Sequence, residues 1–141
     1  NPKTRNGRET HLLIDYSNHR PDWMAKHRIK YSDDMSVCAY DGFTVTNMAI
    51  QLAIYMGFSK IYIIGADCDY SQPKIHFIEV EDDKDKISGG WLPAANDLGI
   101  EGYKAMKKFA YKHGCEIYNV TRGGKLEVFY RDNLERVLRN K

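Results

Sequence analysis

Apolar residues recur with a helical period in two segments of the chain. In the first segment the apolar positions are Val45, Met48, Ala49, Leu52, Ala53 and Met56, a stripe that lasts three turns. Thr44 stands where an N-cap is expected and Gly57 where a C′ glycine is expected. We therefore expect a helix between them, with the stripe against the core. A similar stripe in Asp97–His113, closed by Gly114, predicts a second helix.

A short apolar run follows each of these helices. Lys60–Ile64 carries β-branched residues at successive positions, which is typical of a strand buried on both faces of a parallel sheet. Cys115–Val120 follows the second helix in the same way. Two helix–glycine–strand units in a row predict an α/β fold: a Rossmann-like parallel sheet with flanking helices, in a single domain over residues 1–141.

Three shorter elements and one loop complete the expected organisation. The short elements are two strands at His11–Asp15 and Ser36–Tyr40 and a terminal helix at Asn133–Leu138. Residues 78–96 contain the acidic run Glu79–Lys86 and a Ser-Gly-Gly sequence, so we expect a mobile loop there.

Composition and charge narrow the class of protein. The chain has 141 residues, of which 43% are hydrophobic and 28% charged, as in an ordinary globular domain. Its net charge of +2 does not suggest a nucleic-acid partner. No apolar run approaches the ~20 residues that a membrane span requires. The three cysteines lack metal-ligand spacing, so we expect free thiols and a cytoplasmic location.

Polar residues follow each predicted strand, at the sheet edge where parallel α/β folds bind ligands. Asp67 and Asp69 form an Asp-x-Asp pair that could hold a divalent cation against phosphates. In the alternative interpretation one aspartate caps the loop and the other is solvated. After the second strand, Arg122 and Lys125 flank two glycines that could present amides to an anion. A tight turn explains these glycines equally well.

Two further features are candidates for chemistry. The first is a helix N-terminus that could bind an anion through amides and hydroxyls, at Thr44, Thr46 and Asn47. The second is His76, between the first strand and the acidic loop, where a histidine could serve as a general base. A surface histidine beside an apolar pair is the alternative.

Three stretches resemble the MptE-like family, which is named after an archaeal hydroxymethylpterin diphosphokinase. The stretches are Gly42–Asp67, the His76-Phe77 pair and Ile117–Phe129, which is similar to the closing motif of the family. Many bacterial members occur among surface-polysaccharide and flagellin-glycosylation proteins. The resemblance implies a Rossmann-like fold and a role in glycoconjugate synthesis.

Residues Met56–Tyr70 also resemble bacterial CMP-dependent sialyltransferases, in the order of helix, strand and Gly-x-Asp. That resemblance implies transfer of a sialic-acid-like sugar from a CMP-sugar to a glycan hydroxyl without a metal cofactor. By position it makes His76 the candidate base and Tyr70 a candidate phosphate contact.

The chain departs from both families in one respect. Both carry a glycine-rich nucleotide loop after their first strand, and none occurs before Gly42. The chain therefore resembles the C-terminal part of such a domain, without its N-terminal nucleotide-binding strands. Two other functions remain open: an ATP- and Mg-dependent pyrophosphokinase using Asp67 and Asp69, and a non-catalytic α/β fragment that pairs into a homodimer.

Overall fold

The computed structural model describes residues 13–16, 18, 29–69 and 91–139. Their elements are β1 (Ile14–Asp15), β2 (Ala39–Tyr40), α2 (Val45–Tyr55), β3 (Lys60–Ile63), α4 (Trp91–Lys112), β4 (Glu116–Asn119), β5 (Tyr130–Arg131) and α5 (Leu134–Arg139). The expected α/β fold with parallel strands is confirmed.

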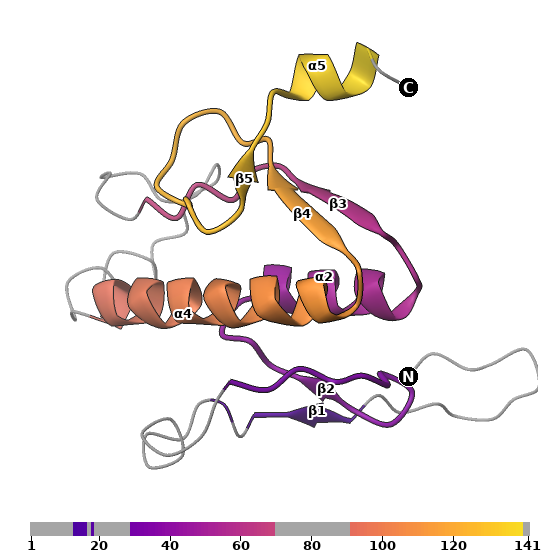
Figure 1. Ribbon diagram of the computed structural model, residues 1–141. Coiled ribbons are helices and arrows are strands. Elements are labelled where there is room, and N and C mark those ends of the chain that lie inside the picture. The colour runs from indigo at the N-terminus through magenta and orange to yellow at the C-terminus, as the bar shows by residue number, and fades with distance from the viewer. Residues whose placement is uncertain (1–12, 17, 19–28, 70–90, 140–141) are drawn as a thin grey trace, which may run out of the picture.

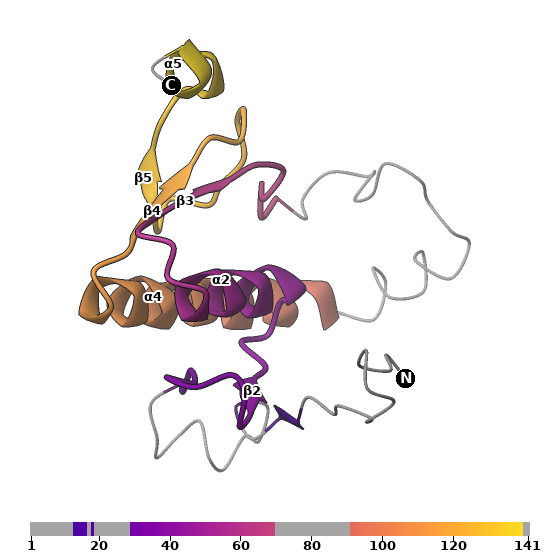
Figure 2. The same cartoon turned by 90° about the vertical axis from the view of Figure 1, so that its right-hand side faces the viewer.

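The strands form two parallel sheets. One has the order β3-β4-β5, with Ile61 opposite Ile117 and Tyr118 opposite Tyr130, and the other pairs β1 with β2. In both views α2 and α4 lie side by side between the two sheets (Figures 1 and 2). Each helix runs roughly antiparallel to the strand that follows it in the chain, α2 to β3 and α4 to β4 (Figure 1).

The core fills the space between the three-stranded sheet and the two helices. Met106 of α4 and Leu126 are fully buried, and Ile63 and Ile117 of the sheet are nearly so. Tyr103 and Phe129 meet edge to face, with ring centroids 5.7 Å apart. This packing fixes the strand ends relative to the helix ends, and therefore positions the loops described below.

The prediction of which α2 face meets the core is wrong. The buried residues of α2 are Asn47, Ile50, Gln51 and Ile54. On the opposite side Val45 is 82% exposed and Met56 is 60% exposed, although both belong to the apolar stripe. The cap residues are confirmed, because the Thr44 side chain accepts a hydrogen bond from the Asn47 amide at 3.1 Å and Gly57 has a φ of 86°.

Two buried amide side chains explain this orientation of α2. Gln51 accepts a hydrogen bond from the Ser32 amide at 2.6 Å and donates to the Tyr40 carbonyl at 3.1 Å. Asn47 donates to the Gly42 carbonyl at 2.7 Å. A polar side chain that satisfies buried backbone groups is stable inside a protein. The polar face of α2 therefore turns inward to bind the segment that precedes the helix.

The expectation that β3 is buried on both faces is also wrong. Ile63 packs toward the helices, whereas Tyr62 is 39% exposed and Ile64 is 66% exposed. Tyr62 stacks on Tyr118 of β4 at a centroid distance of 5.4 Å, and Tyr118 contacts Tyr130 of β5 at 6.3 Å. A row of tyrosines therefore crosses the sheet face that α2 and α4 leave uncovered.

The helix before β4 starts earlier than its apolar period predicts. α4 begins at Trp91 rather than Asp97, so residues 91–96 of the expected loop are helical. Pro93 in the first turn is compatible with this, because the first amides of a helix lack intrahelical partners. The rest of that loop, including the acidic run, lies outside the described residues.

Candidate functional site at the carboxyl ends of β3 and β4

The loops that follow β3 and β4 are joined by two hydrogen bonds. The Ala66 amide donates to Thr121 Oγ1 at 3.1 Å, and the Lys125 amide donates to the Asp67 carbonyl at 2.6 Å. The two sheet-edge regions that the sequence singles out separately therefore form one continuous surface. Its position outside the carboxyl ends of parallel strands is where open α/β sheets bind ligands.

The glycines after β4 form a tight turn against the loop after β3. Gly124 has a φ of 77°, and a Cβ at this position would lie 2.6 Å from Asp67 Cα. The Arg131 guanidinium donates to the carbonyls of Thr121, Gly123 and Gly124 at 2.8, 2.7 and 3.1 Å. The loop therefore directs three carbonyls inward to Arg131, which favours the tight-turn interpretation over an amide cradle for an anion. Sequence reasoning missed Arg131, which stands outside the motif that it organises.

The candidate phosphate-binding cations both have acidic partners. Lys125 Nζ lies 2.7 Å from Asp69 Oδ1, and Arg122 forms an ion pair with Glu135. Hydrogen bonds from the Glu135 backbone and from Arg122 lower the pKa of Glu135. An anionic ligand that approached either cation would compete with a carboxylate. Asp67, two residues before Asp69 in the same loop, is exposed.

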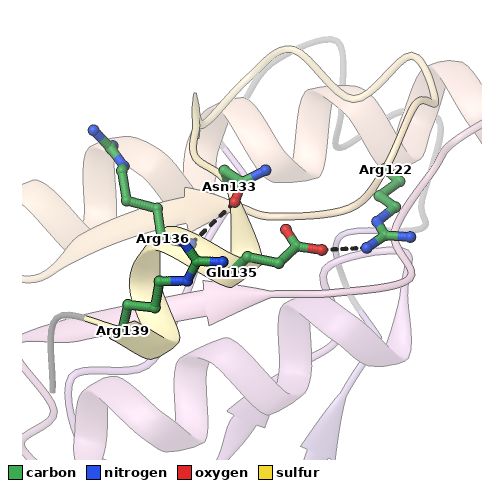
Figure 3. Close-up of a pocket in the computed structure, with 5 residues that line it drawn as sticks. All are labelled: Arg122, Asn133, Glu135, Arg136 and Arg139. Atoms are coloured by element: carbon green, nitrogen blue, oxygen red, sulfur yellow. Dashed lines mark hydrogen bonds and ion pairs between the residues drawn. The ribbon is translucent and has the colours of Figure 1, made fainter.

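Arg122 also borders a shallow basic hollow beside α5. The hollow has a volume of about 540 Å³ and is lined by Arg122, Asn133, Glu135, Arg136 and Arg139. Figure 3 shows the Glu135 carboxylate pointing toward Arg122. Arg136 forms an ion pair with Asp132 at 2.6 Å. The sequence indicated only a terminal helix in this region, so the three arginines that gather here were not anticipated.

The N-terminus of α2 lies at the same end of the sheet as the loop after β3 (Figure 2). Thr44 Oγ1 caps the helix and lies 3.4 Å from the Tyr103 hydroxyl. Burial raises the pKa of Tyr103, hydrogen bonding with Thr44 and Thr46 lowers it, and the Cys68 thiol, which packs against the same core, raises it further. Tyr103 therefore connects the helix N-terminus with the loop after β3. Its place in the apolar stripe of α4 gave no signal of this role.

Asn47 is the deepest polar residue at this helix end. It is fully buried, and its Oδ1 has no hydrogen-bond partner among the described residues, whereas Nδ2 donates to the Gly42 carbonyl. The backbone before it is strained, since Phe43 has a φ of 69°. Thr44 and Asn47 thus have structural roles at the position where an anion was expected, and Thr46 is half-buried beside them.

The expected magnesium ligands are only partly suited to a metal. Asp67 and Asp69 supply the hard oxygen atoms that magnesium prefers. However, the Asp69 carboxylate is bonded to Lys125, which an ion would have to displace. No group of three or more His, Cys, Asp or Glu side chains in the described ranges is arranged to hold a metal ion.

Two candidate residues, His76 and Tyr70, lie outside the described residues. The thiols of Cys38, Cys68 and Cys115 are free, as expected. Within the part of the chain that the structure describes, no helix is both long and apolar enough to cross a membrane.

Comparison with known proteins gives one family. A protein-family model described as 6-hydroxymethylpterin diphosphokinase MptE-like matches residues 7–73. The match includes the first resembling stretch, Gly42–Asp67, and ends before Ile117–Phe129. No curated protein matches the chain. No solved structure matches it. Over residues 7–73, just under half of its length, the chain is similar to the MptE-like family, and the resemblance expected from its sequence is confirmed there.

Proposed function

We propose that the chain takes part in a sugar-nucleotide-dependent transferase of cell-surface glycan synthesis. The donor in this proposal is a CMP-sugar with a sialic-acid-like sugar, and the acceptor is a glycan hydroxyl. The observation that carries the proposal is the junction of the loops after β3 and β4, where Lys125 and Asp69 lie 2.7 Å apart. The similarity to a family of phosphate-transfer enzymes supports a nucleotide ligand at this edge.

The proposed chemistry uses His76 as the general base. Its imidazole removes the proton of the acceptor hydroxyl, and the resulting oxygen nucleophile attacks the anomeric carbon of the donor. The bond between that carbon and the phosphate oxygen breaks, so that CMP leaves as an anion. Lys125 and Arg122 are the proposed contacts for the developing phosphate charge, after exchange of their carboxylate partners for phosphate.

A metal-independent reaction is favoured by the ion pair of Asp69. If a magnesium ion bound both aspartates, Asp69 would lose its contact with Lys125. The site would then hold the two positive charges of the ion beside the positive charge of Lys125. A phosphate that binds Lys125 takes the place of the Asp69 carboxylate, so one anion is exchanged for another. The cytoplasm is the proposed location, because the three cysteines carry free thiols.

A second candidate function is an ATP- and Mg-dependent pyrophosphokinase. It is favoured by the description of the matching family, which names a diphosphokinase. In this function Asp67 and Asp69 would hold magnesium against the ATP phosphates, with Lys125 turned toward the same phosphates.

Thermal unfolding with CMP, UDP and ATP, each with and without magnesium, tests the two functions. A ligand at a hundred times its dissociation constant adds ~2.7 kcal/mol of stability, which raises the Tm by several degrees. We expect a rise with CMP that does not need magnesium. A rise that requires both ATP and magnesium would support the pyrophosphokinase instead. Absence of any response would contradict a nucleotide site in this chain.

A further inference from the structure

Helix α2 has no charged residue on any face. Its eleven residues, Val-Thr-Asn-Met-Ala-Ile-Gln-Leu-Ala-Ile-Tyr, include no Asp, Glu, Lys or Arg. A helix on the surface of a globular protein normally has a charged outer face, and one that is apolar all round is normally buried. In Figure 2, α2 lies in front of α4, and the other described helices and strands lie behind α2 or beside it. The outer face of α2 therefore has the composition of an interface.

The exposed apolar residues of α2 form a regular seam. Val45, Ala49, Leu52 and Met56 follow one another at intervals of four, three and four residues. This is the spacing by which one helix packs along another. Their side chains stand opposite the buried face of α2, so packing on the seam does not disturb the core.

The seam is complementary to a second copy of itself. Intervals of four, three and four read the same in both directions. In an antiparallel pair, Val45 would therefore meet the partner's Met56, and Ala49 would meet the partner's Leu52. A small residue opposite a large one lets two helices approach closely. Each contact occurs twice, as a two-fold interface requires.

We propose that the exposed face of α2 docks against the same face of a second copy of this chain, as an antiparallel helix pair. Phe58 follows the seam two residues after Met56 and is 55% exposed. At ~200 Å² for a large side chain, the exposed parts of Val45, Leu52, Met56 and Phe58 come to ~500 Å² in each copy. Complete burial of this surface in two copies reaches ~1,000 Å², the lower limit of a specific interface. The seam offers no charge that would select a charged partner instead.

Sedimentation equilibrium of the 141-residue chain tests this interface. We expect a concentration-dependent dimer for the wild type and a monomer for Leu52→Glu, because the substitution places a charge in the seam. Leu138→Glu is the matched control, since Leu138 is 58% exposed on α5, and it should leave the dimer intact. An unchanged Tm at low protein concentration would show that Leu52→Glu remains folded. A wild-type monomer at the highest soluble concentration, or a dimer that survives Leu52→Glu, would overturn the proposal.

Cross-linking tests the antiparallel register. Ala49→Cys and Leu52→Cys variants would be prepared with Cys38 and Cys68 replaced by serine, and then mixed and oxidised. We expect the mixed disulfide to form faster than a disulfide within either preparation. Faster formation of the Ala49→Cys self-disulfide would indicate a parallel pair and contradict the register.

Discussion

Lys125 Nζ and Asp69 Oδ1 lie 2.7 Å apart, although the residues are 56 positions apart in the chain. The Lys125 side chain is 63% exposed, whereas that of Asp69 is 19% exposed. Ion pairs with this much solvent contact add no more than about 1 kcal/mol to stability. The consequence of the pair therefore lies in ligand binding, where Asp69 competes with any anion for the Lys125 ammonium.

Asp69→Asn is expected to strengthen magnesium-free binding of CMP. Removing the carboxylate charge takes away one competitor of phosphate for the Lys125 ammonium, and we expect a gain in affinity of roughly three- to tenfold. Lys125→Gln should weaken the same binding by roughly tenfold. Isothermal titration calorimetry with CMP measures both changes.

The two proposed functions differ in the sign of the Asp69→Asn effect. If Asp69 is a magnesium ligand, the substitution removes a metal contact and should weaken ATP binding in the presence of magnesium. Weaker binding of CMP by Asp69→Asn would contradict competition between Asp69 and phosphate. Glu101→Gln, a change in an exposed ion pair of α4, serves as the control for net charge.

Gly124→Ala should destabilise the chain by ~2–3 kcal/mol. The φ of 77° is unfavourable for alanine by ~1 kcal/mol, and the new Cβ would collide with the Asp67 backbone. Relief of the collision would separate the two loops and lengthen the bond between the Lys125 amide and the Asp67 carbonyl. Urea unfolding measures the change in the free energy of unfolding.

Gly123→Ala is the matched control for that measurement. Gly123 has a φ of 69°, but a Cβ there meets no atom of the described residues within 4 Å. We therefore expect a loss of only ~1 kcal/mol, from the backbone conformation alone. Equal losses for the two variants would contradict the close approach of Gly124 to Asp67.

Local signals in the sequence predict the regular elements well. Thr44 and Gly57 mark the ends of α2 because capping depends on a few neighbouring residues. The strands β3 and β4 are recognisable because β-branched residues follow a glycine that ends a helix. The two loops were placed at the same sheet edge for the same reason, since parallel strands end on the same side.

The inward face of α2 could not be predicted from hydropathy. Gln51 and Asn47 are polar in any scale, and their burial depends on backbone groups at Ser32, Tyr40 and Gly42. Such partners become known only when the chain before the helix is placed. The pairing of Lys125 with Asp69 and the role of Arg131 depend in the same way on contacts between separate loops.

Tyr31→Phe should reduce the loss of stability at alkaline pH. Burial raises the pKa of Tyr31, and Tyr103 and Asp41 raise it further. A raised pKa in the folded state gives stability that is complete below the unfolded value, ~10, and is lost as the pH rises above it. The variant lacks this ionisation, so its free energy of unfolding should fall less than that of the wild type between about pH 8 and about pH 10.5.

At neutral pH the same variant should be less stable by ~1 kcal/mol, because the Tyr31 hydroxyl donates to the Gly102 carbonyl at 2.8 Å. Tyr111→Phe is the control, since Tyr111 is 86% exposed and should change neither value. Parallel pH profiles for wild type and Tyr31→Phe would show that Tyr31 is not shielded from solvent as described. Burial also raises the pKa of Tyr40, Tyr103, Cys68 and Cys115, and these groups contribute to the alkaline loss that remains in the variant.

Gln51→Leu should destabilise the chain by ~2–4 kcal/mol. The substitution keeps the side-chain volume nearly constant, but it leaves the Ser32 amide and the Tyr40 carbonyl without their buried partner, at ~1–3 kcal/mol each.

Gln51→Glu separates these two contributions. A carboxylate still accepts from Ser32, yet it faces the Tyr40 carbonyl with a charge and no donor. Burial should therefore raise the pKa of the introduced carboxyl above its unfolded value of ~4.3, and its protonated form can again donate to Tyr40. Because stability from a raised pKa is present at low pH and lost as the pH rises, the deficit of Gln51→Glu relative to wild type should shrink toward pH ~4. The Gln51→Leu deficit should stay constant over that range. Urea unfolding of the wild type and the two variants at neutral pH and at pH ~4 measures how the free energy of unfolding of each variant differs from that of the wild type. If this difference is the same at both pH values for Gln51→Glu, the Tyr40 carbonyl does not depend on residue 51.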